Sequence, residues 1–192
     1  MSYYQRAYLP HWHPENSAIF LTWRLFGSMP TPPPQSHRLP AGKRFVAEDR
    51  ALERASGPHH MKDPAIAGVV AAAIKYGADP LRLYDLHAWV VMSNHVHILM
   101  EPRVELSRIT ESIKRYSARK ANKMLGLTGK PFWQIESYDH WIRTNEEFDN
   151  IIQYIEFNPV KAGLVANPEE YAWSSAGSEA CVTGPNAQKE LV

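Results

Sequence analysis

The sequence predicts an α+β domain built on one antiparallel sheet, and three observations support this prediction. First, segments of strand composition and segments of helical periodicity follow each other in the order β-α-β-β-α-β. Second, only Ser93-Asn94 separates two apolar runs, so the two strands must pair antiparallel. Third, a further helical pattern follows the last strand. This order is the split β-α-β, or ferredoxin-like, arrangement, with helices on one face of the sheet plus an extra C-terminal helix.

Length and composition limit the class of protein. The chain has 192 residues, a formal net charge of +1 and one cysteine, Cys181. A single cysteine excludes a disulfide framework and a cysteine-based zinc cluster, and it suits a reducing cytoplasm. No apolar run approaches the length of a membrane span. We expect residues 1–175 to form a single domain, with 29–60 as a proline-rich loop and connection, and residues 176–192 to form a flexible tail.

The individual elements are predicted from composition and from cap signals. The strand over 18–26 is rich in aromatic and β-branched residues, and five prolines in 29–40 exclude a helix or an inner strand there. Asp63-Pro64 begins one helix, and Thr144 begins another with a capping box. The remaining predictions are a short helix over 45–54, strands over 86–92, 95–100 and 132–137, and helices over 64–77, 106–125 and 145–158.

Two histidines stand out in the second strand of the hairpin. His95 and His97 are separated by one valine in a run of buried-strand composition. Successive side chains of a strand point to opposite faces, so the two imidazoles share a face. Two neutral imidazoles on a rigid strand make half of a metal site. The same spacing also fits two polar residues on the exposed face of a half-buried strand, and the sequence leaves open which face they occupy.

The last predicted helix carries a phenol and a carboxamide on one flank. Tyr154 lies beside the apolar face of this helix, and Asn158 follows four residues later on the same side. A phenol can act as a nucleophile, and a carboxamide oxygen is a hard ligand for a divalent cation. Each residue alone also fits a structural role, as a rim tyrosine and a helix-end asparagine. The apolar face comprises Phe148, Ile151, Ile152 and Ile155.

Together these motifs resemble a known family. His95-Val96-His97, preceded by Met-Ser-Asn, is similar to the His-hydrophobe-His motif of the HUH endonucleases. The run from Tyr154 to Leu164, Tyr-x-x-x-Asn-Pro-Val-x-Ala-Gly-Leu, is similar to the catalytic helix of the single-tyrosine transposases. The resemblance extends from about Tyr8 to Ser175 and is greatest to the REP-associated tyrosine transposases. Ser93 departs from the proline that relatives often carry, and the segment from 29 to 60 is longer than their usual connection.

The resemblance implies a metal-dependent enzyme that cuts and rejoins single-stranded DNA near hairpins such as REP-type palindromes. It identifies Tyr154 with the nucleophile that forms a 5′-phosphotyrosine intermediate. It identifies His95, His97 and Asn158 with the ligands of a divalent metal, Mg²⁺ or Mn²⁺. It also implies a bacterial, nucleoid-associated protein of the cytoplasm that acts as a monomer or homodimer. The target hairpin, and whether the tyrosine acts within one subunit, are left open.

A basic segment supplies the predicted DNA contacts. Residues 103–130 hold eight Lys or Arg against two Glu, although the whole chain is nearly neutral. Such a segment is typical of phosphate binding, and also of a solvated helix face. Tyr116, a rival nucleophile, lies on the apolar stripe of this helix and is expected in the core, as are Trp89 and Trp133, which could otherwise stack on bases. The predicted DNA-binding residues are Lys114, Arg115, Arg119, Lys120 and Lys123.

Three other functions compete with this interpretation. A histidine-triad hydrolase needs a third histidine where this strand has Leu99. A metal hydrolase that combines the pair with other histidines lacks a carboxylate–histidine motif, and its candidate residues are His11, His13, His59, His60 and His140. The stronger rival is a non-catalytic module of the same fold, which would bind hairpin DNA through the basic helix and form no covalent complex.

Overall fold

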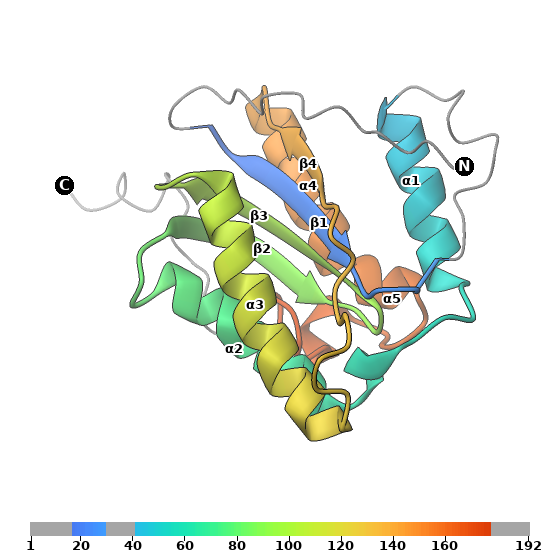
Figure 1. The fold of residues 1–192 in the computed structure, drawn as a ribbon. Helices are drawn as coiled ribbons and strands as arrows, with labels where there is room; N and C mark the ends of the chain where they lie inside the picture. Colours follow the sequence, from blue (N-terminus) through green and yellow to red (C-terminus); the bar gives the residue numbers. More distant parts are fainter. Residues whose placement is uncertain (1–16, 30–40, 178–192) are drawn as a thin grey trace, which may run out of the picture.

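The computed structural model describes residues 17–29 and 41–177, and for residues 41–44 it describes the backbone alone (Figure 1). The predicted flexible tail therefore lies outside the described residues from 178 onward, as do most of the proline-rich segment and His11 and His13. The strands are β1 (Ile19–Arg24), β2 (Tyr84–Val91), β3 (His95–Pro102) and β4 (Tyr138–Trp141). The helices are α1 (Ala41–Glu53), α2 (Pro64–Ala78), α3 (Leu106–Leu125), α4 (Asn145–Glu156) and α5 (Asn158–Lys161), with short 3-10 turns η2 (His60–Lys62) and η3 (Pro168–Glu170).

The four strands form one antiparallel sheet in the order β2-β3-β1-β4. This confirms the predicted α+β class and the hairpin between β2 and β3. In the described part of the chain, no helix has the length and apolar character needed to cross a membrane. Both predicted caps form: the Asp63 side chain accepts a hydrogen bond from the Ala65 N–H, and the Thr144 hydroxyl accepts one from the Glu147 N–H. The capping box is only half formed, because the Glu147 carboxylate accepts from the Arg143 N–H. Gly126 ends α3 in the left-handed conformation.

The two faces of the sheet belong to two separate apolar clusters. One cluster joins β1 and β3 to α2 and α3 through residues such as Trp23, Ile98 and Ile113. The other joins the opposite face to α4, through residues such as Phe20 and Ile155. The extra C-terminal helix therefore covers the face that α2 and α3 leave open, and α1 lies on the same side (Figure 1). Each face of the sheet is thus covered by at least one helix.

The last strand is not where the sequence predicts it. We expected a strand over 132–137, but β4 begins at Tyr138. Trp133 instead packs into the core, where its Nε1–H donates to the Ser117 hydroxyl at 2.9 Å. Lys114 donates to the carbonyl oxygens of residues 134 and 135, both at 3.1 Å. The predicted strand is reduced to a single antiparallel bridge between Trp133 and Leu25, and the backbone from there to β4 follows an irregular path.

The chain beyond α5 returns to the edge of the sheet. The Val91 N–H donates to the Trp173 carbonyl at 2.8 Å, and the Ser175 N–H donates to the Trp89 carbonyl at 2.8 Å. The Tyr171 hydroxyl donates to the Val91 carbonyl at 2.9 Å. Residues 171–175 are therefore fixed along β2, on the opposite edge of the sheet from β4.

Two glycines in α2 give a stability prediction with a built-in control. A Cβ at Gly77 would lie 2.6 Å from the buried Tyr84 hydroxyl, whereas one at Gly68 would meet the Trp173 ring at an ordinary 3.5 Å. We expect Gly77→Ala to cost about 1–3 kcal/mol of unfolding free energy, the range for overpacked cores. Gly68→Ala should be neutral or stabilising, because alanine favours a helix interior. Urea unfolding of both variants checks this, and equal effects would contradict it.

Candidate metal centre and tyrosine

His95 and His97 point to the face of the sheet that α1 and α4 cover. Val96, Ile98 and Met100 belong to the cluster under α2 and α3, so the alternate positions of β3 face the other way. Both imidazoles are almost completely buried, with 1% and 0% of their surface exposed. This excludes the alternative of two polar residues on an exposed face, and it resolves which face the pair occupies.

Each imidazole is oriented through its Nδ1 atom. His97 Nδ1 lies 2.8 Å from the Thr22 hydroxyl, and His95 Nδ1 lies 2.7 Å from the Asn94 side-chain oxygen. The Asn94 amide nitrogen donates to the Leu52 carbonyl at 2.8 Å, which fixes the amide oxygen toward His95. Because that oxygen can only accept, His95 carries its proton on Nδ1 and presents a lone pair on Nε2. This outer hydrogen bond is the usual arrangement around a metal-binding histidine.

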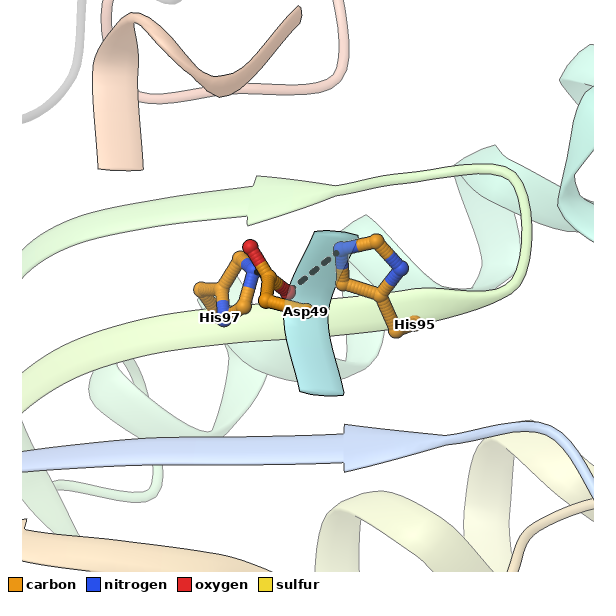
Figure 2. A group of neighbouring side chains, drawn as sticks. All are labelled: Asp49, His95 and His97. Carbon is orange, nitrogen blue, oxygen red and sulfur yellow. Dashed lines mark ion pairs between the residues drawn. The ribbon is translucent and has the colours of Figure 1, made fainter. Parts of the chain in front are cut away.

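A buried carboxylate that the sequence did not reveal completes the cluster. Asp49 of α1 is 4% exposed, and its Oδ1 lies 3.4 Å from His95 Nε2 and 3.2 Å from His97 Nε2 (Figure 2). These three atoms are buried and have no hydrogen-bond partner of ordinary geometry among the described residues. No motif marked Asp49, because it lies on a helix that the sequence predicted only weakly, and 46 residues before His95.

The three side chains fit a divalent cation. One potential ligand atom from each lies within 4.8 Å of the others. Octahedral ligation at about 2.1 Å places neighbouring ligand atoms about 3 Å apart, close to the spacing of the Nε2 and Oδ1 atoms. Two imidazole nitrogens and one carboxylate oxygen form a mixed set that suits several divalent metals. The cluster can therefore hold a cation, although its residues do not identify the metal.

The protonation states agree with this use. Burial, followed by the charge of His97, lowers the pKa of His95 to about 3, so this imidazole is neutral at pH 7. Burial alone would raise the pKa of the Asp49 carboxyl. The His97 charge and hydrogen bond, with smaller effects of His95 and Tyr154, outweigh burial and hold this pKa well below its usual range. A neutral imidazole beside an ionised carboxylate is the form in which both groups bind metals.

Tyr154 is joined to the same carboxylate. Its hydroxyl donates a short hydrogen bond to Asp49 Oδ2, while Oδ1 faces the histidines. Phe20 and Phe45 pack edge-on against the phenol ring, and the Lys161 ammonium lies 4.7 Å from the ring centroid. Burial, and then the charge of Asp49, raise the pKa of the Tyr154 phenol above its ordinary value. The sequence predicted the flank on which Tyr154 lies, but not the hydrogen bond that directs it.

Asn158 is buried at the start of α5, with 1% of its surface exposed. Neither its amide nitrogen nor its amide oxygen has a hydrogen-bond partner among the described residues. Buried amides are normally paired, so this side chain has unused ligand capacity. No hydrogen bond joins the Asn158 amide to either histidine among the described residues, and its role as a metal ligand stays a prediction.

The basic helix lies on the other side of the sheet from this cluster. α3 packs with α2 on the face opposite to His95 and His97. Tyr116 is 53% exposed, so its predicted core position is wrong: the buried stripe runs through Ile109, Ile113 and Ser117 instead. Trp89 and Trp133 are buried, as expected of core residues. Four of the five predicted DNA-binding residues are exposed: Arg115, Arg119, Lys120 and Lys123.

Lys114, the fifth predicted residue, makes contacts within the protein. Besides its two carbonyl partners, its ammonium group donates to the Ser137 hydroxyl at 2.7 Å. Burial lowers the pKa of Lys114 to about 8. A direct role in DNA binding stays a prediction for this residue, whose ammonium group is already used to fix the path between α3 and β4.

The remaining described histidines lie outside the cluster. His59 is within 2.8 Å of both the Ser93 hydroxyl and the Ala55 carbonyl, and His60 stacks on Phe132. His140 forms a 2.7 Å contact with the Glu147 carboxylate. None of them belongs to the acidic and histidine cluster found in the described residues. The geometry gives no support to a hydrolase that combines them with His95 and His97.

Part of this chain is similar to known transposases. Residues 78–158, which include His95, His97, Tyr154 and Asn158, match the family model for IS200-like transposases. The chain is 31% identical over 107 residues to a REP-associated tyrosine transposase of Escherichia coli (strain K12). This match covers 54% of the chain and 60% of that relative. A solved structure of a REP-associated tyrosine transposase bound to a REP hairpin is 23% identical, with a TM-score of 0.49, over 91% of this chain and 82% of that one.

Proposed function

We propose that this protein is a DNA-cleaving and rejoining transposase in which Tyr154 is the nucleophile. The observation that carries the proposal is the buried cluster of Asp49, His95 and His97 with the Tyr154 hydroxyl directed at it. The IS200-like match supports it, because the matched residues include the tyrosine and both histidines. A phenol beside a group of metal ligands would supply two things that phosphodiester attack uses: a nucleophile, and a site at which a bound cation would neutralise charge on the phosphate.

The proposed reaction is a reversible transfer of a phosphodiester bond. The Tyr154 oxygen attacks the phosphorus, a tyrosine–phosphate bond forms, and the bond from phosphorus to the 3′ oxygen breaks. The phenol loses one proton as it attacks, the leaving oxygen takes up one proton and becomes a free 3′-hydroxyl, and the protein keeps the 5′ phosphate, so the step is balanced in protons. Because the new phosphodiester retains the energy of the old one, a 3′-hydroxyl can reverse the step and join strands. Asp49 Oδ2, which accepts the phenol hydrogen bond, holds the Tyr154 oxygen toward the histidines.

A divalent cation, Mg²⁺ or Mn²⁺, would be held by His95, His97 and an oxygen ligand. Family resemblance assigns the oxygen to Asn158, whereas the geometry favours Asp49. When bound, the cation would polarise the scissile phosphate. Both imidazoles are held in place by hydrogen bonds, His97 to Thr22 of β1 and His95 to Asn94 of the turn between β2 and β3.

We further propose that the substrate is single-stranded DNA next to a hairpin such as a REP-type palindrome. The Escherichia coli relative is named for its association with REP sequences, and it supports this choice over unstructured DNA. The exposed basic residues of α3 would contact the phosphate backbone, so affinity should fall steeply as salt rises. Such a protein would act on the nucleoid of a bacterial cell.

A labelled hairpin with single-stranded flanks tests the proposal. With Mg²⁺ or Mn²⁺, DNA labelled at its 3′ end should give a labelled protein band that survives denaturing electrophoresis. DNA labelled at its 5′ end should give no such band, but a shortened product that a polymerase can extend. The contrary result is a shift in the mobility of the native DNA with no denaturation-resistant band from either the 3′-labelled or the 5′-labelled DNA. That result would favour the non-catalytic hairpin-binding module instead.

A further inference from the structure

The opposite placement of the catalytic cluster and the basic helix sets a constraint on the DNA. The cluster of Asp49, His95 and His97 lies on one face of the sheet, and α3 lies on the other. A DNA molecule that contacts both must pass around the sheet, either along an edge strand or over the strand ends. The β2 edge is lined by residues 171–175, which are hydrogen-bonded to it. The other edge is β4, and the segment that leads to it comes directly from α3.

That segment connects the two faces by a short path. Residues 134–137 are joined to α3 through Lys114, and the next residue, Tyr138, begins β4. The Tyr138 ring stacks on Phe45 with centroids 4.7 Å apart and meets Phe20 edge-on. Both phenylalanines also contact His97 and Tyr154. Three residues of extended chain span about 10 Å, so residue 135 lies within a few nucleotides of the cluster.

One side chain at this corner is displayed to solvent to an unusual degree. Ile135 is 93% exposed, more than any other exposed large hydrophobic side chain in the described part of the chain. The backbone beneath it is fixed, because Lys114 donates to the carbonyls of residues 134 and 135 and to the Ser137 hydroxyl. The partly buried ammonium group of Lys114 thus fixes a segment whose central side chain, Ile135, is left in solvent. Isoleucine is one of the apolar residues that proteins insert against nucleobases.

We propose that the DNA strand runs from α3 around the β4 edge to Tyr154, and that Ile135 packs against a nucleobase of the strand at this corner. The inference rests on the proposed function, since it takes single-stranded DNA as the ligand. Arg115 and Arg119 hold the phosphates before the corner, and Ile135 covers an unpaired base as the strand turns toward the cluster. Lys114 is a positioning residue in this arrangement, because it acts through the backbone that carries Ile135.

The test uses the full chain and a hairpin oligonucleotide with single-stranded flanks. 2-Aminopurine is placed at each flanking position in turn, with the metal left out so that no cleavage occurs. We expect one position to change its fluorescence on binding, and Ile135→Ser to remove that change and raise Kd about fivefold to tenfold. Ile135→Leu should restore both readouts. Leu81→Ser, at a 45% exposed leucine in the turn before β2, is the matched control and should behave as the unsubstituted protein.

The outcomes separate this inference from the proposed function. If Ile135→Ser keeps the fluorescence change and the Kd of the unsubstituted protein, the corner contact is wrong, whatever the catalytic result. If no protein form gives a covalent DNA complex, the proposed function is wrong. Lys114→Met provides a second variant: it leaves Ile135 in the sequence but releases its backbone, so it should weaken the fluorescence change. An unaltered response in folded Lys114→Met would contradict the positioning role.

Discussion

Tyr154→Phe abolishes the covalent protein–DNA complex while DNA affinity stays within about twofold. The substitution removes only the phenolic oxygen, so the ring keeps its contacts with Phe20 and Phe45. Without that oxygen no phosphotyrosine can form, and removal of a nucleophile typically lowers turnover by at least about a thousandfold. The measurement is the labelled band on denaturing electrophoresis, together with Kd from a metal-free binding assay.

Tyr116→Phe is the matched control for this result. Tyr116 is exposed on the basic helix, on the face of the sheet opposite to the cluster, so its loss should leave the covalent complex at the level of the unsubstituted protein. A covalent complex that persists in Tyr154→Phe and disappears in Tyr116→Phe would overturn the assignment of the nucleophile.

The second large effect is expected on the affinity of the cluster for a divalent cation. Asp49→Ala removes the carboxylate whose Oδ1 faces both imidazoles, at 3.4 and 3.2 Å. We expect the Kd for Mn²⁺ to rise by about tenfold to a hundredfold, the range that loss of supporting groups alone produces at metal sites. Calorimetry of Mn²⁺ binding to the protein without DNA measures this independently of catalysis.

Two further variants complete this test: one is a control, and the other asks whether the Asn158 amide is the oxygen ligand of the metal. Glu48→Ala removes the neighbouring acid of the same helix, which does not belong to the cluster, and should leave Mn²⁺ binding unaltered. Asn158→Ala tests the ligand that family resemblance assigns. Normal Mn²⁺ affinity in Asp49→Ala, combined with loss in Asn158→Ala, would show that Asp49 is not a ligand and that the amide is.

The sequence predicted those parts of the site that depend on local periodicity. Strand alternation is sufficient to place His95 and His97 on one face, and helical spacing is sufficient to place Tyr154 beside the apolar face of α4. Both predictions needed no knowledge of distant contacts. The α+β class and the β2–β3 hairpin followed for the same reason, because a two-residue link permits only one pairing.

Features set by distant side chains escaped prediction. Asp49 reaches the cluster only because α1 packs over β3, and nothing in the residues around it signals a ligand. The strand expected over 132–137 is shortened to one bridge at Trp133, and Lys114 and Ser117 bind this segment from another element. Tyr116 was expected in the core because it is an aromatic residue three positions after Ile113, but the buried stripe advances in steps of four, through Ser117 and Ala121.

The hydrogen bonds of residues 171–175 have a consequence for the helix that carries the phenol. Before α4 the chain is paired to the sheet through β4, and after α5 it is paired through β2 at the opposite edge. The Ser175 hydroxyl also contacts the Glu156 carboxylate at the end of α4, at 3.3 Å. The nucleophile is therefore carried by a segment anchored at both of its ends to the sheet that holds the imidazoles. A chain cut after residue 170 would retain every candidate ligand and yet leave the phenol's helix attached at one end only.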